Sequence, residues 1–360
     1  MADQSMTGVR CTHAVDLADR IDLFELIGNE RVLELSHQGR GPGFATEATV
    51  AKSTGVEQRR ILRPGVKPID LAVEVIDRLE EEFDLNIRDC PWIGLCHSNT
   101  DPAAADLLAD KLSRVIGLPR ERVVNINFGC VGYLELLRRG AAALAELPQG
   151  TRVPLLTVET PEDWHDASDR AFCGIISAGA TGTILQRDAG HKLRHINVEH
   201  IPVSDELRNH QPFFWIEDGE FLRFSGDTSR RRVMRMNGEA VFLSGVNLMI
   251  EACRTAFHAV SPTDQRIIVV PHQPSGKMLR AMIAVLRDEL PCAEIINNLA
   301  LYGNSISSSI PTVLARINDV LVDQGTDRLS EGDLLLLPAA GICMETRADH
   351  LTQGWAVIEW

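Results

Sequence analysis

The spacing of apolar residues changes repeatedly between a helical and a strand period, and this alternation constrains the fold most strongly. In the first such segment, Leu71, Val75, Ile76 and Leu79 recur at helical spacing, and a short apolar run follows at 92–96. Apolar residues three and four positions apart line one face of a helix, whereas short apolar runs rich in β-branched residues are typical of buried strands. The alternation predicts an α/β chain with a sheet covered by helices.

The same rhythm continues to the end of the chain with one interruption. It predicts helices over 103–116, 133–147, 240–260, 277–290 and 307–322. It predicts strands over 123–127, 153–158, 174–185, 266–270, 334–337 and 356–360. A polar segment from about 186 to 237 separates two stretches of this kind, so we expect two α/β halves, residues 1–188 and 189–360.

Composition and charge narrow the class of protein. Apolar residues make up 44% of the chain, and 36 Lys and Arg against 50 Asp and Glu give a net charge of −14. Such a chain has no general attraction to nucleic acid or to an anionic membrane, and neither partner is expected. No basic segment followed by an apolar stretch opens the chain, and no apolar run approaches the roughly 18 residues that cross a bilayer, which predicts a cytoplasmic protein.

Cys130 lies in a turn of small residues between a predicted strand and a predicted helix. The segment reads Asn127-Phe128-Gly129-Cys130-Val131-Gly132-Tyr133. Unpaired N–H groups at a helix start carry partial positive charge, which lowers the pKa of a thiol and can hold an oxyanion. Cys130 is therefore a candidate nucleophile among eight cysteines that form no CxxC pair; the alternative is a small buried apolar residue.

Two other segments carry polar residues at the ends of predicted elements. His272 follows an apolar strand and stands between two prolines, where α/β proteins present catalytic groups; the alternative is a loop histidine that caps the next helix. Asn304 lies in a turn of small polar residues ahead of a helix, where an N-cap or turn role is the ordinary alternative.

In order and spacing, these three segments resemble the ketoacyl-acyl-carrier-protein synthase III group of the thiolase superfamily. That group carries a Cys in a small-residue loop, a His in a Pro-His-Gln segment and an Asn in a Gly-Asn segment, which correspond here to Cys130, His272 and Asn304. Further similar stretches lie at 53–60, 169–182 and 332–341. The resemblance implies a thiolase-like five-layered αβαβα fold of two similar halves, and a homodimer.

The chain departs from the group's pattern at three places. Ala178 stands where the group has the Asp of its Gly-Asp-Gly-Ala-Gly stretch, and the region 43–54 lacks the Trp that stacks on the adenine of coenzyme A. No arginine stands between Trp164 and Ser168 as a partner for that ring. The departures indicate a divergent, secondary-metabolism member rather than one primed by acetyl-CoA.

By this resemblance the chain is an acyltransferase that forms an acyl-Cys130 thioester and condenses it with a malonyl-type thioester in a decarboxylative Claisen reaction. The backbone N–H groups of Cys130 and Gly341 would hold the oxyanion, and His272 and Asn304 would donate hydrogen bonds to the enolate. One alternative is acyl transfer to an alcohol or amine in natural-product biosynthesis, with His272 as general base. Another is a catalytically silent subunit.

Coenzyme A or acyl-carrier-protein thioesters are the expected substrates, and no cofactor is expected. Six basic residues are predicted to receive an acidic carrier or the coenzyme A phosphates, unless they are ordinary solvated side chains: Arg230, Arg231, Arg232, Arg235, Lys277 and Arg280. His191, His195 and His200 suggest a metal site, but along a strand positions four apart lie about 13 Å apart, so no metal is expected.

Overall fold

Two five-stranded arrays with the same topology form the centre of the computed structural model, which describes residues 8–360 except 13, 40, 188, 263, 346 and 347. The first array is ordered β6 (Val123–Ile126), β5 (Ile93–Cys96), β7 (Arg152–Glu159), β8 (Gly179–Arg187), β1 (Val9–Cys11). The second is ordered β13 (Ala293–Ile295), β12 (Ile267–Val269), β14 (Leu334–Leu336), β16 (His350–Glu359), β9 (His191–Pro202). Residues 1–7, in which no targeting segment is expected, lie outside this description.

The two arrays repeat each other in strand direction as well as in order. In each, the first three strands are parallel and the last two pairings are antiparallel. Short pairing between β1 and β9, at Arg10 with Lys192 and Cys11 with His191, joins them into one sheet. The common topology shows two similar halves, although no sequence repeat is visible. The boundary after residue 188 falls outside the described residues and stays a prediction.

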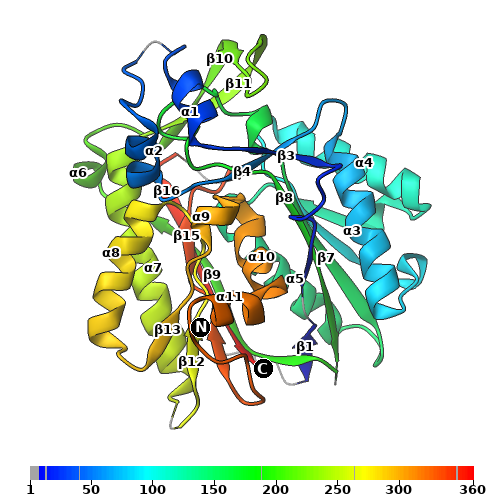
Figure 1. The fold of residues 1–360 in the computed structure, drawn as a ribbon. Helices are drawn as coiled ribbons and strands as arrows, with labels where there is room; N and C mark the ends of the chain where they lie inside the picture. Colours follow the sequence, from blue (N-terminus) through cyan, green and yellow to red (C-terminus); the bar gives the residue numbers. More distant parts are fainter. Residues whose placement is uncertain (1–7, 13, 40, 188, 263, 346–347) are drawn as a thin grey trace.

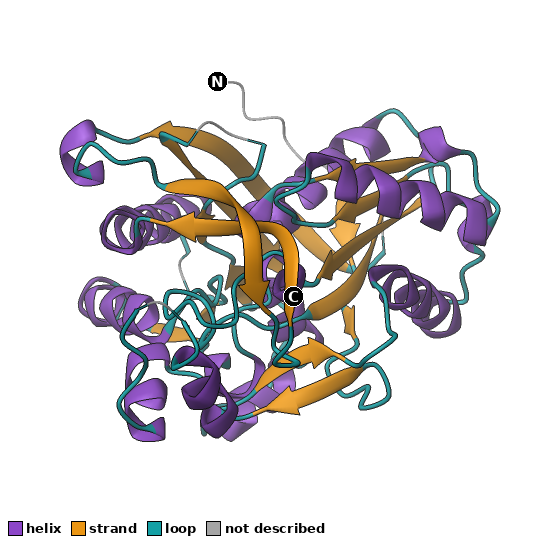
Figure 2. Ribbon diagram, turned by 90° about the horizontal axis from the view of Figure 1, so that it is seen from above, coloured by secondary structure: helices purple, strands orange, loops and turns teal. Residues whose placement is uncertain are grey.

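Helices and sheets alternate in five layers. Helices α3 (Pro68–Phe83) and α4 (Pro102–Ile116) cover the outer face of the first array, and α7 (Gly238–Val260) and α8 (Gly276–Glu289) cover that of the second. Helices α5 (Gly132–Ala145) and α10 (Ser309–Ala315) lie between the arrays (Figure 1). Seen from above, the strands lie inside with helices on both outer sides (Figure 2). The five-layered thiolase-like fold is therefore confirmed.

Local sequence explains where the long helices begin and end. In α3, the Asp70 carboxylate accepts a hydrogen bond from the Lys67 N–H at 2.8 Å, and the apolar stripe predicted from spacing is buried. In α4, the Asp101 side chain accepts from the Ala103 N–H at 3.0 Å, and the helix ends at Gly117 with φ of +72°. Caps of this kind satisfy backbone groups that a helix end leaves unpaired.

Three predicted elements differ from the structure. The strand predicted over 174–185 begins only at Gly179, because the preceding backbone pairs with Asn304: the Ser177 N–H donates to the Asn304 carbonyl, and the Asn304 N–H donates to Ile175. The helix predicted over 307–322 is two helices, α10 and α11 (Ile317–Asp323), which separate at Arg316, whose guanidinium binds the buried Asp16 carboxylate. The closing strand, β16, starts at His350 rather than near 356.

The polar segment between the halves contains a β-hairpin that the sequence analysis did not predict. Strands β10 (Phe214–Leu222) and β11 (Thr228–Met236) pair with each other outside the main sheet, at the top of Figure 1. Other small elements are β2 (Val15–Asp16), β3 (Phe24–Ile27), α1 (Asn29–Ser36), α2 (Glu47–Thr54), β4 (Arg59–Leu62), α6 (Asp205–Arg208), α9 (Leu299–Tyr302) and β15 (Ala339–Gly341).

Helix α7 has the length and apolar composition of a membrane-spanning segment, a feature the sequence analysis did not single out. Half of its most apolar window is buried inside the protein. It packs against β15, β16 and α8 and contributes Met249, Ile250 and Cys253 to a core cluster. Within the described residues, this packing is that of a core helix in a globular protein.

Candidate active site

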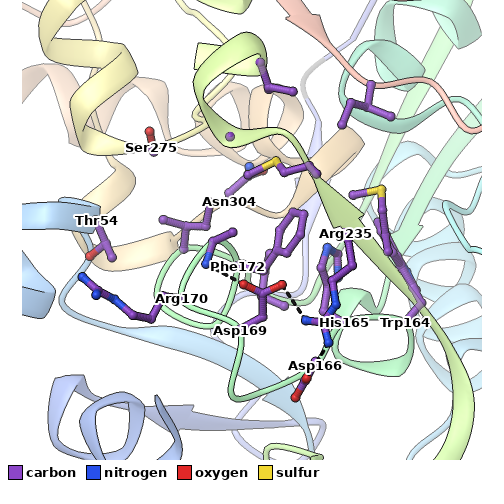
Figure 3. Close-up of a pocket in the computed structure, with 18 of the residues that line it drawn as sticks. Thr54, Trp164, His165, Asp166, Asp169, Arg170, Phe172, Arg235, Ser275 and Asn304 are labelled. Carbon is purple, nitrogen blue, oxygen red and sulfur yellow. Dashed lines mark hydrogen bonds and ion pairs between the residues drawn. The ribbon is translucent and has the colours of Figure 1, made fainter. Parts of the chain in front are cut away.

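One cavity of about 1190 Å³ brings together the residues predicted to react. Cys130, His272, Asn304 and Gly341 all line it, although they come from four separate parts of the chain. Its walls are rich in aromatic and sulfur-containing side chains, including Phe44, Trp164, Phe172, Met234, Met236, Met278 and Met344. Figure 3 shows Asn304 in the same pocket as Phe172 and His165. The arrangement suits a long apolar substrate that ends at a few polar groups.

Cys130 lies in the 3₁₀ turn Gly129–Val131, between strand β6 and helix α5. Gly129 has φ of +66°, and a Cβ there would stand 2.1 Å from the Ile342 carbonyl oxygen. Only glycine adopts this conformation and permits this approach without strain. The turn therefore carries the Cys130 thiol from the end of a buried strand to the start of a helix, as its sequence predicts.

The pKa of the Cys130 thiol is shifted in the opposite direction to the one expected from its place at a helix start. Burial and, to a smaller extent, the nearby Glu159 carboxylate raise the pKa to about 12, because hydrogen bonds from the backbone offset them only partly. Loss of hydration outweighs the helix field because a buried thiolate loses the water that stabilises it. The resting nucleophile is a protonated thiol, and the reaction needs an acceptor for its proton.

Gly341 lies against the nucleophile at the end of β15. A Cβ at this position would stand 2.7 Å from the Cys130 Cβ and 2.8 Å from its Sγ. Only a residue without a side chain leaves room for the thiol and a reacting carbonyl. The oxyanion roles of the Cys130 and Gly341 N–H groups stay predictions, which this close approach supports.

We expect Gly341→Ala to lower the rate of Cys130 acylation by about 10²-fold, because displacement of a reacting group by about 1 Å has effects of that size. The rate of mass increase on the Cys130 peptide measures it. Gly238→Ala is the matched control, since Gly238 lines the same cavity and a Cβ there meets nothing within 4 Å. Equal acylation rates for both variants would contradict the steric role of Gly341.

His272 is buried, uncharged and held by two contacts. Its backbone N–H donates to the Pro338 carbonyl at 2.9 Å, and its Nδ1 lies 2.6 Å from the Ser309 hydroxyl. Its Nε2 has no hydrogen-bond partner among the described residues. Burial lowers the pKa of the ring to about 3, so the imidazole is neutral at pH 7. The free Nε2 is therefore available to a substrate.

Asn304 is oriented by its own loop. Its Oδ1 accepts from the Ile306 N–H at 2.9 Å, and its Nδ2 donates to the Pro274 carbonyl at 3.1 Å, next to the His272 segment. Ile306 has φ of +53°, a conformation that costs a β-branched residue energy and is found most often at functional sites. The same contacts bring the Asn304 and His272 loops together.

The six basic residues predicted to dock a carrier do not share one environment. The Arg231 guanidinium donates to the carbonyls of His165 and Leu222. Arg235 pairs with Asp166 and Asp169 (Figure 3), and also with Glu217. These contacts hold the hairpin to the cavity wall. The docking role of Arg231 and Arg235 stays a prediction, for side chains that are already hydrogen-bonded or paired within the fold. The other four, Arg230, Arg232, Lys277 and Arg280, are exposed, and their docking role stays a prediction.

The three histidines considered for a metal all lie on β9, which is a strand as predicted. The His191 ring stacks on Trp360 at 3.7 Å between centroids, and the His200 Nδ1 lies 3.1 Å from the Thr352 hydroxyl. The described residues contain no group of three or more His, Cys, Asp or Glu side chains placed to hold a metal ion. Packing and hydrogen bonding account for the positions of His191 and His200.

Two polar residues near the site escaped the sequence analysis. Glu159 ends strand β7 next to the nucleophile, and its only signal is a carboxylate that closes an apolar run. His165 lies on the cavity wall between Trp164 and Phe172, with ring centroids 4.0 and 4.1 Å away, and its Nδ1 lies 2.8 Å from the Pro161 carbonyl. Neither residue belongs to a recognisable motif, because their neighbours come from distant parts of the chain.

His165 and His272 make the fold sensitive to acid. Burial lowers the pKa of both rings to about 3, so the folded chain binds fewer protons than the unfolded chain below pH 6.5. Their full contribution to stability is therefore present above pH 6.5 and is lost as the pH falls toward 3, at about 1.4 kcal/mol for each unit of pKa shift.

We expect His165→Phe, which keeps an aromatic ring between Trp164 and Phe172, to flatten the dependence of the melting temperature on pH between 6.5 and 3. Melting curves recorded at a series of pH values measure this dependence. The control is His258→Phe, which changes an exposed histidine. The prediction is wrong if His165→Phe and the wild type lose stability in parallel.

Comparison with known proteins shows what this chain is similar to. A family model described as 3-Oxoacyl-[acyl-carrier-protein (ACP)] synthase III C terminal matches residues 258–350, a span that contains His272, Asn304 and Gly341. Beta-ketoacyl-[acyl-carrier-protein] synthase III of Cereibacter sphaeroides is 24% identical over 319 residues, covering 88% of this chain and 91% of that protein. The protein of the same name from Helicobacter pylori J99 is 25% identical over 300 residues, covering 81% and 85%.

Solved structures share the fold. The 3-oxoacyl-(acyl carrier protein) synthase III of Pseudomonas aeruginosa PAO1 superposes with a TM-score of 0.71 at 21% identity, covering 98% of both chains. The priming beta-ketosynthase of the R1128 polyketide biosynthetic pathway superposes with a TM-score of 0.72 at 16% identity, covering 100% of this chain and 98% of the other.

Proposed function

The chain is a divergent ketoacyl synthase III-like protein, and on that basis we propose that it is a condensing acyltransferase that carries the acyl group on Cys130. It would join this group to a malonyl-type thioester and release a β-ketoacyl thioester for fatty-acid or polyketide biosynthesis. The observation that carries the proposal is that Cys130, His272, Asn304 and Gly341 line one cavity. The names of the relatives support the same class of reaction.

In the first step, the Cys130 sulfur attacks the carbonyl carbon of an acyl thioester. The bond to the donor's sulfur breaks, and the donor leaves as a thiol with the proton that Cys130 gave up. His272 is suited to pass that proton, since its Nε2 is unpartnered and its ring is neutral at pH 7. The Cys130 and Gly341 N–H groups would hold the oxyanion in the tetrahedral intermediate.

In the second step, the bond between the malonyl carbon and its carboxylate breaks and CO₂ leaves. The electron pair remains as an enolate, whose carbon attacks the acyl-Cys130 carbonyl and displaces the cysteine sulfur as a thiolate. A proton taken up from solvent then restores the resting thiol. Neutral donors at Nε2 of His272 and Nδ2 of Asn304 would stabilise the enolate oxygen. The Ser309 hydroxyl supports both steps, because it can either donate to or accept from Nδ1 of His272 and so permits either ring tautomer.

A second candidate is transfer of the acyl group from Cys130 to an alcohol or amine, with His272 as general base. One observation favours it: four carboxylates line the cavity, at Asp166, Asp169, Glu217 and Glu220, against three cations, at Arg170, Arg235 and Lys277. A wall of this charge attracts a malonyl carboxylate or a coenzyme phosphate less than it attracts a neutral or amine acceptor.

The test starts with candidate acyl thioesters and measures mass on the Cys130 peptide. A malonyl thioester is then added and CO₂ is collected. Acylation followed by CO₂ release supports condensation, whereas transfer to an added alcohol or amine without CO₂ supports the second candidate. If no thioester acylates Cys130, both are wrong.

Other expectations from the resemblance also remain proposals. We propose that two copies pair, that the acyl group arrives on coenzyme A or an acyl carrier protein, and that no bound cofactor takes part. Light scattering at micromolar concentration tests the pairing, and a mass of 39.7 kDa for the species in solution would contradict it. The cytoplasmic location stays an expectation from the sequence.

A further inference from the structure

Glu159 is a buried carboxylate that the mechanism above does not use. It closes strand β7 and has no exposed surface. Its Oε2 accepts from the Ser98 N–H at 3.0 Å, and its Oε1 accepts from the Ser98 hydroxyl at 2.9 Å and from the Ser307 hydroxyl. A buried carboxylate with this many donors is expensive to move, because each bond lost leaves a polar group without a partner.

The two serines connect Glu159 to both reactive loops. The Ser98 hydroxyl accepts from the N–H of Gly129, the residue before the nucleophile, at 3.1 Å. Ser307 lies in the 3₁₀ turn Ile306–Ser308, three residues after Asn304, and its Cβ would be 3.0 Å from a Cβ at Gly132. One carboxylate thus joins the Cys130 turn of the first half to the Asn304 loop of the second.

The charge of Glu159 has no cation to balance it. None of the ion pairs recorded among the described residues includes it, and the titratable groups that interact with it are the Cys96 thiol, 3.8 Å from Oε1, and the Cys130 thiol. Burial raises the pKa of Glu159 to about 7, so the carboxylate is negative above neutral pH. That negative charge disfavours a second one on Cys130.

We propose that Glu159 is a positioning residue that fixes the Cys130 turn against the Asn304 loop, and that its negative charge adds to burial in disfavouring the Cys130 thiolate. The catalytic meaning of this role rests on the proposed function, but the reactivity of the thiol can be measured without any substrate.

The test is alkylation by iodoacetamide between pH 6 and 10, followed peptide by peptide with mass spectrometry. We expect Glu159→Gln, which keeps the shape and removes the charge, to alkylate Cys130 about tenfold faster at pH 9, as a one-unit fall in pKa requires. The shift is limited because burial, the larger cause of the raised pKa of Cys130, remains. The exposed Cys292 is an internal control whose rate stays the same.

Glu162→Gln is the matched control variant. Glu162 is also a buried carboxyl group whose pKa burial raises, to about 8, but its hydrogen bond is to the Leu62 N–H, away from the nucleophile. We expect the Cys130 alkylation profile of Glu162→Gln to match that of the wild type. The profile of Glu159→Asp, which keeps the charge, should lie nearer to the wild type than that of Glu159→Gln. Ser307→Ala removes one hydrogen bond without changing charge, so turnover with an accepted thioester should fall several-fold while the alkylation profile holds.

Equal Cys130 profiles for folded Glu159→Gln, Glu162→Gln and wild type would overturn the proposal. If Glu159→Gln does not fold, the wild type alone decides. Its Cys130 rate should rise by less than tenfold per pH unit between pH 6 and 8, as Glu159 ionises, and a full tenfold rise would overturn the proposal. Failure of every thioester to acylate Cys130 would refute the proposed function and leave the alkylation result standing.

Discussion

Cys130→Ala is expected to abolish acyl-enzyme formation and to lower turnover by at least about 10⁴-fold, because it removes the nucleophile on which the covalent mechanism depends. The thiol is the only described one that lines the cavity together with His272, Asn304 and Gly341. Intact-protein mass after incubation with an acyl thioester measures the first effect, and product formation measures the second. The variant should fold, since it removes one sulfur atom at the cavity wall.

Cys292→Ala serves as the matched control, because Cys292 is exposed and is not one of the residues that line the cavity. It should acylate and turn over as the wild type does. An acyl adduct on the Cys130→Ala protein at the wild-type rate would show that another residue is the nucleophile, and the proposed mechanism would then be wrong.

His272→Ala is expected to slow CO₂ release from the malonyl thioester by about 10²–10³-fold, since it removes a donor to the enolate oxygen. The ring is neutral and its Nε2 is free, so the loss concerns a hydrogen bond rather than a charge. Single-turnover measurements separate this step from Cys130 acylation, which should fall by a smaller factor if His272 acts mainly in condensation.

The control is His258→Ala, which changes an exposed histidine. This variant should carry out both steps at the wild-type rate. An equal loss in acylation and in CO₂ release would favour the general-base role of the acyl-transfer alternative. Unchanged rates in both steps would remove His272 from the mechanism.

The elements that sequence predicted well are those whose burial is regular. The stripe Leu71, Val75, Ile76 and Leu79 is buried in α3, and the runs at 92–96 and 123–127 became β5 and β6. The spacing of apolar residues in these elements depends on whether one face or both faces are buried, and this spacing is visible in the local sequence. The hairpin of β10 and β11 was missed because its register depends on the cavity wall it covers rather than on a repeating pattern.

Cys130, His272 and Asn304 were predictable as candidates because each lies in a turn whose small residues and prolines are visible in the sequence. Glu159 and His165 were not, since a carboxylate or imidazole is informative only when its neighbours are known. The partners of Arg231 and Arg235 could not be predicted for the same reason: the His165 carbonyl and the Asp166, Asp169 and Glu217 carboxylates are brought close by folding.

Sequence by itself determined the α/β class, most helices and strands, and the three turns that present Cys130, His272 and Asn304. Only the tertiary structure decided the protonation of Cys130 and His272. Helix position alone favours a thiolate at Cys130, but burial and the Glu159 charge raise its pKa to about 12, and burial keeps His272 neutral. Hydration and charge act through space, and the residues that remove water from Cys130 or lie beside it come from both halves of the chain.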